Sequence, residues 1–306
     1  MSSIDVERYH EQGFTLVDVL VEDEVLRLRQ SIDTILGWSA DRKVTDTAFH
    51  RSDNQHIGDE IEAYGQKSKH YYFHLLTDER FLPVQSVFLR PEIMRHVEEL
   101  LGAPLVINNA SLFAAEPGTC YRLGWHRDVI QIPQDQIDEA AIYDGGRFHN
   151  SVQVNLALYE DQTLWVVPGS HRRPNTMGER AAFSGSKHYA PIDAEMPDAM
   201  QVRIRPGQAA LYNNNLIHRG WNPSFRQPRR SLHMGYHCTA KPPTWHFYLL
   251  NEQRFTDAYR ARMTPEIRTM IDAYFACRRQ YPRMEDTWNF CRRNAVTESG
   301  VMLTVR

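Results

Sequence analysis

Apolar positions in the first part of the chain alternate between helical and strand spacing. Residues 4–12 and 22–36 carry them at helical spacing. Acidic residues fill the first turn of the second segment, where the helix dipole favours them. Between the two, residues 14–20 alternate between apolar and polar side chains, as a half-buried strand does. The pattern therefore predicts a helix, a strand and a second, longer helix.

A polar stretch and another helical segment follow. Residues 38–68 show no clear period and are expected to form a surface excursion, whereas residues 69–76 are aromatic and favour a strand. Pro91 then favours the start of a helix over residues 93–101, and Gly102 favours its end. These segments complete an N-terminal flank that is mostly helical.

Short strands separated by turn residues dominate the middle of the chain. Pro-Gly pairs at 168–169 and 206–207 are among the turn signals between them. Many short strands at near-regular spacing are typical of a β-sandwich or jelly roll. The strands are expected at residues 104–114, 121–127, 151–159, 163–167, 200–205, 208–213 and 230–238.

Two stretches, residues 129–150 and 171–198, interrupt this β-rich region at more than the usual length of a connection. Loops of this size in a compact domain are often functional, so we expect them to cover an active site and to select its substrate. Helical patterns return at residues 251–278 and 284–293.

Composition narrows the function classes. The 306 residues, 42% hydrophobic and 24% charged, suit a single domain over residues 1–306, with a β-core at about 104–240 and helical flanks. A net charge of −3 without a basic block disfavours nucleic acid and anionic membranes as partners. Four cysteines lie far apart, as in a reducing compartment. Without a signal-peptide profile or an apolar run of about 20 residues, we expect a cytoplasmic protein that acts on a small molecule.

Candidate chemistry begins with His126 and Asp128. Side chains at i and i+2 of a strand leave it on the same side, so this pair can bind one metal ion together. His218, at the end of an apolar-flanked stretch from Asn213 that is predicted to be a strand, is the best third ligand. Two histidines and one carboxylate leave positions open for substrate and dioxygen, an arrangement typical of non-haem Fe(II) oxygenases.

Arg229 and Ser231 add a candidate anion site. They are also i and i+2, and a guanidinium beside a hydroxyl suits the far carboxylate of a 2-oxoacid whose other end binds the metal. Taken alone, Arg229 with Arg226 and Arg230 favours a solvated turn cluster over an anion site. The metal ligands upstream favour the oxoacid anchor.

Further polar residues fit the same pocket. Asn109 shares a strand face with Ser111 and Phe113 and is a candidate contact for the oxoacid. Gln153 and Asn155, on one face of the strand that begins near 151, are alternatives. Each of them also fits the role of an ordinary buried polar residue.

An ordered set of motifs resembles the phytanoyl-CoA dioxygenase family over about residues 5–240. The resemblance implies a double-stranded β-helix (jelly roll, cupin-like), Fe(II), 2-oxoglutarate as co-substrate and O2. It also implies that His126, Asp128 and His218 bind iron and that Arg229 anchors 2-oxoglutarate. We interpret His171 as structural. The motifs lie at residues 9–14, 124–128, 164–171 and 206–212, followed by His218 and Arg229.

The predicted activity is oxidation of an unactivated C–H bond, by default hydroxylation, with release of succinate and CO2. A secondary metabolite or a lipid-like acid is the expected substrate. The same iron site also supports desaturation, epimerisation and ring closure. Two other hypotheses remain: a jelly-roll binding protein without turnover, and a zinc hydrolase. The hydrolase would need a Glu base close to the ligands, as in His-Glu-x-x-His, and none is adjacent.

Overall fold

Two antiparallel sheets form the centre of the protein. The computed structural model describes residues 5–41, 70–128, 151–185, 189–240 and 252–282. The six-stranded sheet has the order β1 (Phe14–Asp18), β8 (Gln208–Asn213), β5 (Ser151–Ala157), β10 (Arg229–Cys238), β3 (Leu105–Ala115) and β2 (His70–His74). The four-stranded sheet has the order β4 (Tyr121–Arg122), β9 (His218–Asn222), β6 (Leu164–Val166) and β7 (Met200–Gln201).

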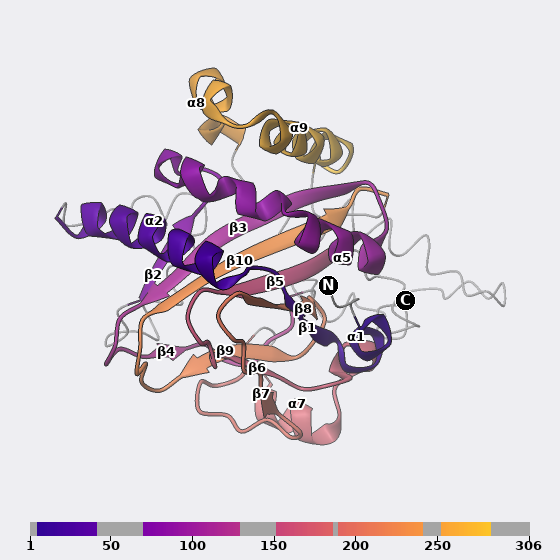
Figure 1. Ribbon diagram of the computed structural model, residues 1–306. Coiled ribbons are helices and arrows are strands. Elements are labelled where there is room, and N and C mark those ends of the chain that lie inside the picture. The colour runs from indigo at the N-terminus through magenta and orange to yellow at the C-terminus, as the bar shows by residue number, and fades with distance from the viewer. Residues whose placement is uncertain (1–4, 42–69, 129–150, 186–188, 241–251, 283–306) are drawn as a thin grey trace, which may run out of the picture.

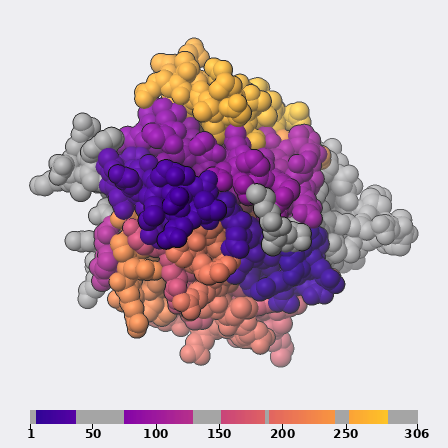
Figure 2. All heavy atoms as spheres, in the orientation of Figure 1, coloured from indigo at the N-terminus to yellow at the C-terminus, as the bar shows by residue number. Residues whose placement is uncertain are grey.

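Helices cover one side of the large sheet, and the small sheet lies on the other (Figure 1). The cover consists of η1 (Glu79–Leu89), α5 (Pro91–Leu101) and α9 (Pro265–Gln280), with α2 (Glu22–Asp41) packed on η1. α8 (Asp257–Arg262) and α9 form the yellow cap in Figure 2, and indigo α2 lies beside the magenta segment that contains η1. The arrangement is the predicted jelly roll with helical flanks.

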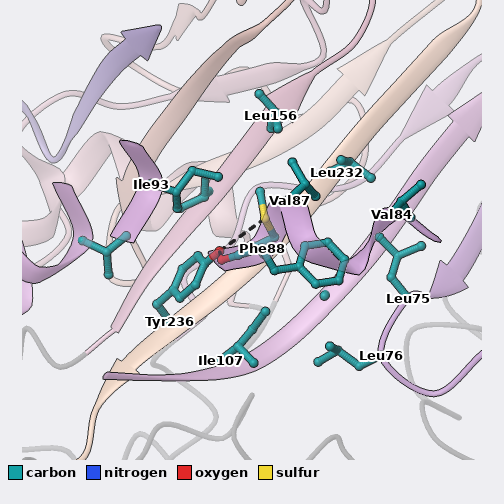
Figure 3. Packing of buried hydrophobic residues seen from close by; sticks show 14 of the residues in the cluster. Leu75, Leu76, Val84, Val87, Phe88, Ile93, Ile107, Leu156, Leu232 and Tyr236 are labelled. Carbon is teal, nitrogen blue, oxygen red and sulfur yellow. Dashed lines mark hydrogen bonds between the residues drawn. The ribbon is translucent and has the colours of Figure 1, made fainter. Parts of the chain in front are cut away.

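Strand alternation divides β10 between an apolar core and a polar interior. Leu232, Met234 and Tyr236 belong to the core cluster under the helices. Tyr236 also donates a hydrogen bond of 2.6 Å to the Phe88 carbonyl of η1, so the one polar atom it buries is satisfied (Figure 3). Residues at odd positions of β10 point the other way, between the two sheets. Every residue of the strand is buried.

Several predicted elements differ from the structure. The segment 200–205 pairs as a strand only over Met200–Gln201, with a single bridge at Ile204. The segment 121–127 forms a strand only at its first two residues, because the chain then leaves the β9 ladder and re-joins it as a single bridge at His126. Asn213 to His218 is not one strand: β8 ends at Asn213, and His218 begins β9 after a turn. The interruption 171–198 contains a helix, α7 (Met177–Phe183), started by a capping box.

Some predictions lie outside the described residues. These are the loop 129–150, the helix 284–293 and most of the polar excursion 38–68. Within the described residues, no helix combines the length and the apolar character needed to cross a bilayer.

A buried histidine fastens the N-terminal helix α1 (Val6–Gln12) to the barrel. His171 belongs to the short helix η3 (Ser170–Arg172). Its Nε2 lies 3.0 Å from the backbone carbonyl oxygen of His10 in α1. Gly13 ends α1 in the left-handed conformation, and a Cβ there would lie 2.6 Å from His171 Nδ1. The close approach therefore requires glycine. His171 contributes to this junction and does not belong to the metal-binding group described below.

We expect His171 to make stability depend on pH. Burial lowers the pKa of His171 from 6.5 to about 4, although the hydrogen bond to His10 opposes the shift. The unfolded chain therefore binds more protons between these values, and the free energy of unfolding falls as pH drops through that window, by up to about 3 kcal/mol. His171→Asn should flatten this slope in urea unfolding measured across the window. His10→Gln, at an exposed position, should keep it; an unchanged slope in the His171 variant would contradict the assignment.

Candidate metal centre

Two distant segments bring three metal-binding side chains together. His126 and His218 face each other in an isolated antiparallel bridge, with backbone hydrogen bonds of 2.9 and 3.0 Å. Asp128 follows, and its amide donates to the Asn214 carbonyl at 2.9 Å. One donor atom from each of the three buried side chains lies within 4.8 Å of the others. Among the described residues, this is the group of histidine and carboxylate side chains that can hold a metal ion.

The backbone fixes which nitrogen each imidazole presents. His126 Nδ1 lies 2.9 Å from the Gly124 carbonyl oxygen, and His218 Nδ1 lies 2.9 Å from the Leu216 carbonyl oxygen. A carbonyl oxygen only accepts, so each Nδ1 carries a proton and each Nε2 keeps a lone pair. Each Nε2 lies 3.4 Å from a different oxygen of Asp128. The donor set therefore fits a divalent iron ion.

A chain of hydrogen bonds extends from Asp128 across the large sheet. Gln153 donates to the Asp128 carboxylate, and the Tyr212 hydroxyl donates to Gln153 Oε1 at 3.1 Å. Asn155 Nδ2 donates to the Tyr212 hydroxyl at 3.5 Å, and its Oδ1 lies 2.6 Å from His233 Nδ1. The structure thus places Gln153 and Asn155 in a network that orients a metal-binding carboxylate. The sequence did not single out Tyr212, although the alternation of its strand puts it on this face.

Arg229 is buried, and its guanidinium forms an ion pair through Nε. Its Nε donates to Asp161 Oδ2 at 2.8 Å, and the two side chains are 7% and 4% exposed. Burial alone would raise the pKa of Asp161, but the Arg229 guanidinium and the hydrogen bonds from Thr163 outweigh it and hold that pKa below its ordinary value. Phe113 and Tyr121 each place a ring 5.2 Å from the guanidinium carbon. The solvated turn cluster is therefore excluded for Arg229.

Two polar atoms near this ion pair have no partner. Arg229 Nη1 and Ser231 Oγ are both buried, and neither has a hydrogen-bond partner among the described residues. Because both are inward-facing on β10, they can hold one carboxylate between them. Asn109, the third predicted contact, lies on the neighbouring strand and accepts a hydrogen bond of 3.0 Å from Ser111. No sequence signal identified Asp161, whose proximity depends on the turn after β5.

The interruption 171–198 reaches the metal centre through Tyr189. Its ring lies 4.7 Å from that of His126. The neighbouring residues are pinned to the barrel: the Ala190 amide donates to the Trp125 carbonyl at 2.8 Å, and Trp125 Nε1 donates to the Ala194 carbonyl at 3.1 Å. One of the two predicted lids therefore contacts a metal-binding histidine, and no sequence pattern pointed to Tyr189 within it.

Comparison with known proteins agrees with this geometry. The model of the family described as phytanoyl-CoA dioxygenase matches residues 9–231. No curated protein matches the chain. Among solved structures, AviO1 from Streptomyces viridochromogenes Tue57 is similar, with 19% identity, a TM-score of 0.51, and coverage of 80% of this chain and 100% of that one.

Two similar structures contain ligands. HygX from Streptomyces hygroscopicus, with nickel, 2-oxoglutarate and hygromycin B bound, has 16% identity and a TM-score of 0.51, over 76% of this chain and 86% of that one. EctD from S. alaskensis, with 2-oxoglutarate and 5-hydroxyectoine, has 19% identity and a TM-score of 0.53, over 78% and 77%. At these identities the structures show a shared fold.

We expect the anaerobically purified protein to bind one Fe(II) ion at these three side chains. His126→Ala and His218→Ala should each weaken metal affinity by about 100-fold or more, because each removes a directly binding nitrogen. His171→Ala is the matched control, since His171 is buried but lies outside the group. Titration calorimetry with Fe(II) measures the affinity. Equal losses in all three folded variants would show that the site is wrongly assigned.

Proposed function

The chain belongs to the phytanoyl-CoA dioxygenase family, and we propose that it hydroxylates an unactivated C–H bond of a small organic substrate. It is a non-haem iron oxygenase that depends on 2-oxoglutarate. The observation that carries the proposal is the combination of a buried two-histidine, one-carboxylate group with a buried guanidinium whose Nη1 has no partner. The first suits iron, and the second suits the far carboxylate of the oxoacid.

His126, Asp128 and His218 would hold the iron. Bound there, iron and 2-oxoglutarate together activate dioxygen, and the oxoacid is converted to succinate and CO2 as the substrate is oxidised. The protein's own part is to hold the ligands in fixed orientations. The two backbone carbonyls do so for the imidazoles, and Gln153 does so for the Asp128 carboxylate.

Arg229 and Ser231 would bind the far carboxylate of 2-oxoglutarate. Asp161 holds Nε of the guanidinium, so the fork is oriented before the co-substrate arrives. Burial strengthens the attraction between guanidinium and carboxylate, because little water is left to screen it. The same burial makes the empty site costly, since Nη1 and the Ser231 hydroxyl then lack partners. Asn109, opposite Gly235 and so four positions along the sheet from Ser231, is proposed to contact another part of 2-oxoglutarate.

Substrate choice would lie with the segment that carries Tyr189 and with residues 129–150. Tyr189 is next to a metal ligand, where a bound substrate must also be. HygX and EctD, which share the fold, hold hygromycin B and 5-hydroxyectoine, both small organic molecules. A secondary metabolite is therefore the favoured substrate class here, with a lipid-like acid as the second. We further propose that residues 1–306 form one oxygenase domain.

Other reactions would use the same residues, and analysis of the product distinguishes them from hydroxylation. Desaturation, epimerisation and ring closure all begin with the same C–H activation, so mass spectrometry of the product distinguishes them from hydroxylation. A jelly-roll protein without turnover would form no succinate from 2-oxoglutarate. A zinc hydrolase would contain zinc after anaerobic purification and would not require the oxoacid.

Two neighbouring arginines provide a matched test of the anchor. Arg229 faces the barrel interior, while Arg230 lies on the opposite, helix-covered face and pairs with Asp33 of α2 at 2.7 Å and with Glu116 at 2.8 Å. We expect Arg229→Lys to raise KM for 2-oxoglutarate by about tenfold or more, because lysine cannot replace the planar fork. Arg230→Lys should leave that KM unchanged. Succinate formation at varied 2-oxoglutarate measures both. Equal effects from the two substitutions would rule out Arg229 as the anchor.

A further inference from the structure

The large sheet contains a β-bulge close to the metal centre. Gly235 of β10 pairs with Asn109, but the next residue, Tyr236, pairs with Ile107. Asn108 is therefore an extra residue on β3, opposite no partner of its own. Bulges re-aim side chains and are enriched beside active sites. Here the bulge brings the side chain of Asn108 over Gly235, so it joins the inward-facing residues.

The carboxamide of Asn108 fills the space that a side chain at position 235 would need. A Cβ built on Gly235 would collide with Asn108 Oδ1. Asn108 is 1% exposed, and within the part of the chain that the structure describes neither its amide nitrogen nor its amide oxygen has a hydrogen-bond partner. Leaving both atoms of a buried amide unpaired is costly, and native structures rarely do so without a ligand or a functional reason.

The position of this amide relates it to the metal centre. Gly235 pairs across the sheet with Gln153, whose amide donates to Asp128. Asn108, Gly235 and Gln153 thus lie side by side on three adjacent strands, and two strand spacings are about 10 Å. Ser231 is four positions away along β10, or about 13 Å. The Asn108 amide therefore lies away from the proposed anchor of 2-oxoglutarate.

We propose that the Asn108 carboxamide binds the organic substrate, and that the substrate carries a neutral amide or lactam group. The inference rests on the proposed function and names the substrate class for it. A carboxamide offers one donor and one acceptor side by side, which an amide of the substrate matches. Asn109, Ser111 and Gln153, the inward-facing residues nearest to it on β3 and β5, are neutral and polar, so this wall suits neither an acyl chain nor a phosphate.

Two independent substitutions disrupt the contact. Asn108→Leu removes the donor and the acceptor but keeps the branching and the number of heavy atoms of the side chain. Gly235→Ala keeps Asn108 but displaces its amide, because the new methyl group takes that space. Asn222→Leu, at a half-buried amide on β9, is the matched control. Because the two substitutions disrupt one contact, combining them should cost no more than Asn108→Leu alone.

The experiment measures succinate released by the iron-loaded enzyme with 2-oxoglutarate. The probes are lactams and N-acetylated amino sugars, their carbocyclic isosteres without the amide, and acyl thioesters. We expect amide-bearing compounds to raise succinate release above the substrate-free rate. Asn108→Leu and Gly235→Ala should raise KM for these compounds by about tenfold or more. In both variants and the control, KM for 2-oxoglutarate and the substrate-free rate should equal those of the wild type.

Several outcomes would overturn the inference. They are stimulation by thioesters or isosteres alone, no stimulation by any probe, an unchanged KM for the amide compounds in both variants, and a changed KM for 2-oxoglutarate. Failure of the proposed function looks different: the wild-type protein would then form no succinate with or without probes.

Discussion

The rest of the structure depends on the alternation of side chains along β10, where successive residues point to opposite faces of the sheet. β3 and β5 flank the strand, so both of its faces are enclosed and every residue is buried. Leu232, Met234 and Tyr236 extend the apolar core, and Arg229 and Ser231 line the interior. A slip of one residue would put the arginine into the core and apolar side chains into the site. Packing of the helices therefore also fixes the position of the candidate co-substrate anchor.

Buried charge in the centre is balanced locally. Arg229 is compensated by Asp161, which leaves one arm of the guanidinium for a further anion. Arg127, between the two metal-binding residues of its segment, points away from them and donates to the carbonyls of Ser170 at 2.7 Å and of Asn215 at 2.5 Å. It thereby ties the turn before β9 to the segment that carries the ligands. A buried guanidinium without such hydrogen-bond partners would be costly in either place. Together these contacts hold His126 and His218 in register.

The sequence was sufficient where spacing alone decides the outcome. The placing of Arg229 and Ser231 on one face follows from the geometry of β10. His126 and Asp128 do converge as their spacing predicted, but the chain there is not a strand and joins β9 only through the bridge at His126. The bounds of α5 followed from Pro91 and Gly102. Contacts that depend on register or on turns did not follow. The turn between Asn213 and His218, the partner Asp161 and the extra residue Asn108 all arise from tertiary pairing, which no local pattern encodes.

The pairing of β1 with β8 bears on how the chain can be assembled. Phe14 to Asp18 form the edge strand of the large sheet and pair with Gln208 to Tyr212. Most of the jelly roll lies between these two strands in the sequence. During synthesis the N-terminal strand must therefore wait for its partner, and the bridge between His126 and His218 waits for the same segment. Such long-range pairings slow folding and leave strand edges exposed meanwhile. A nascent chain released before β8 would thus be a template for aggregation, and a chaperone that shields Phe14 to Asp18 would be of most use during that interval.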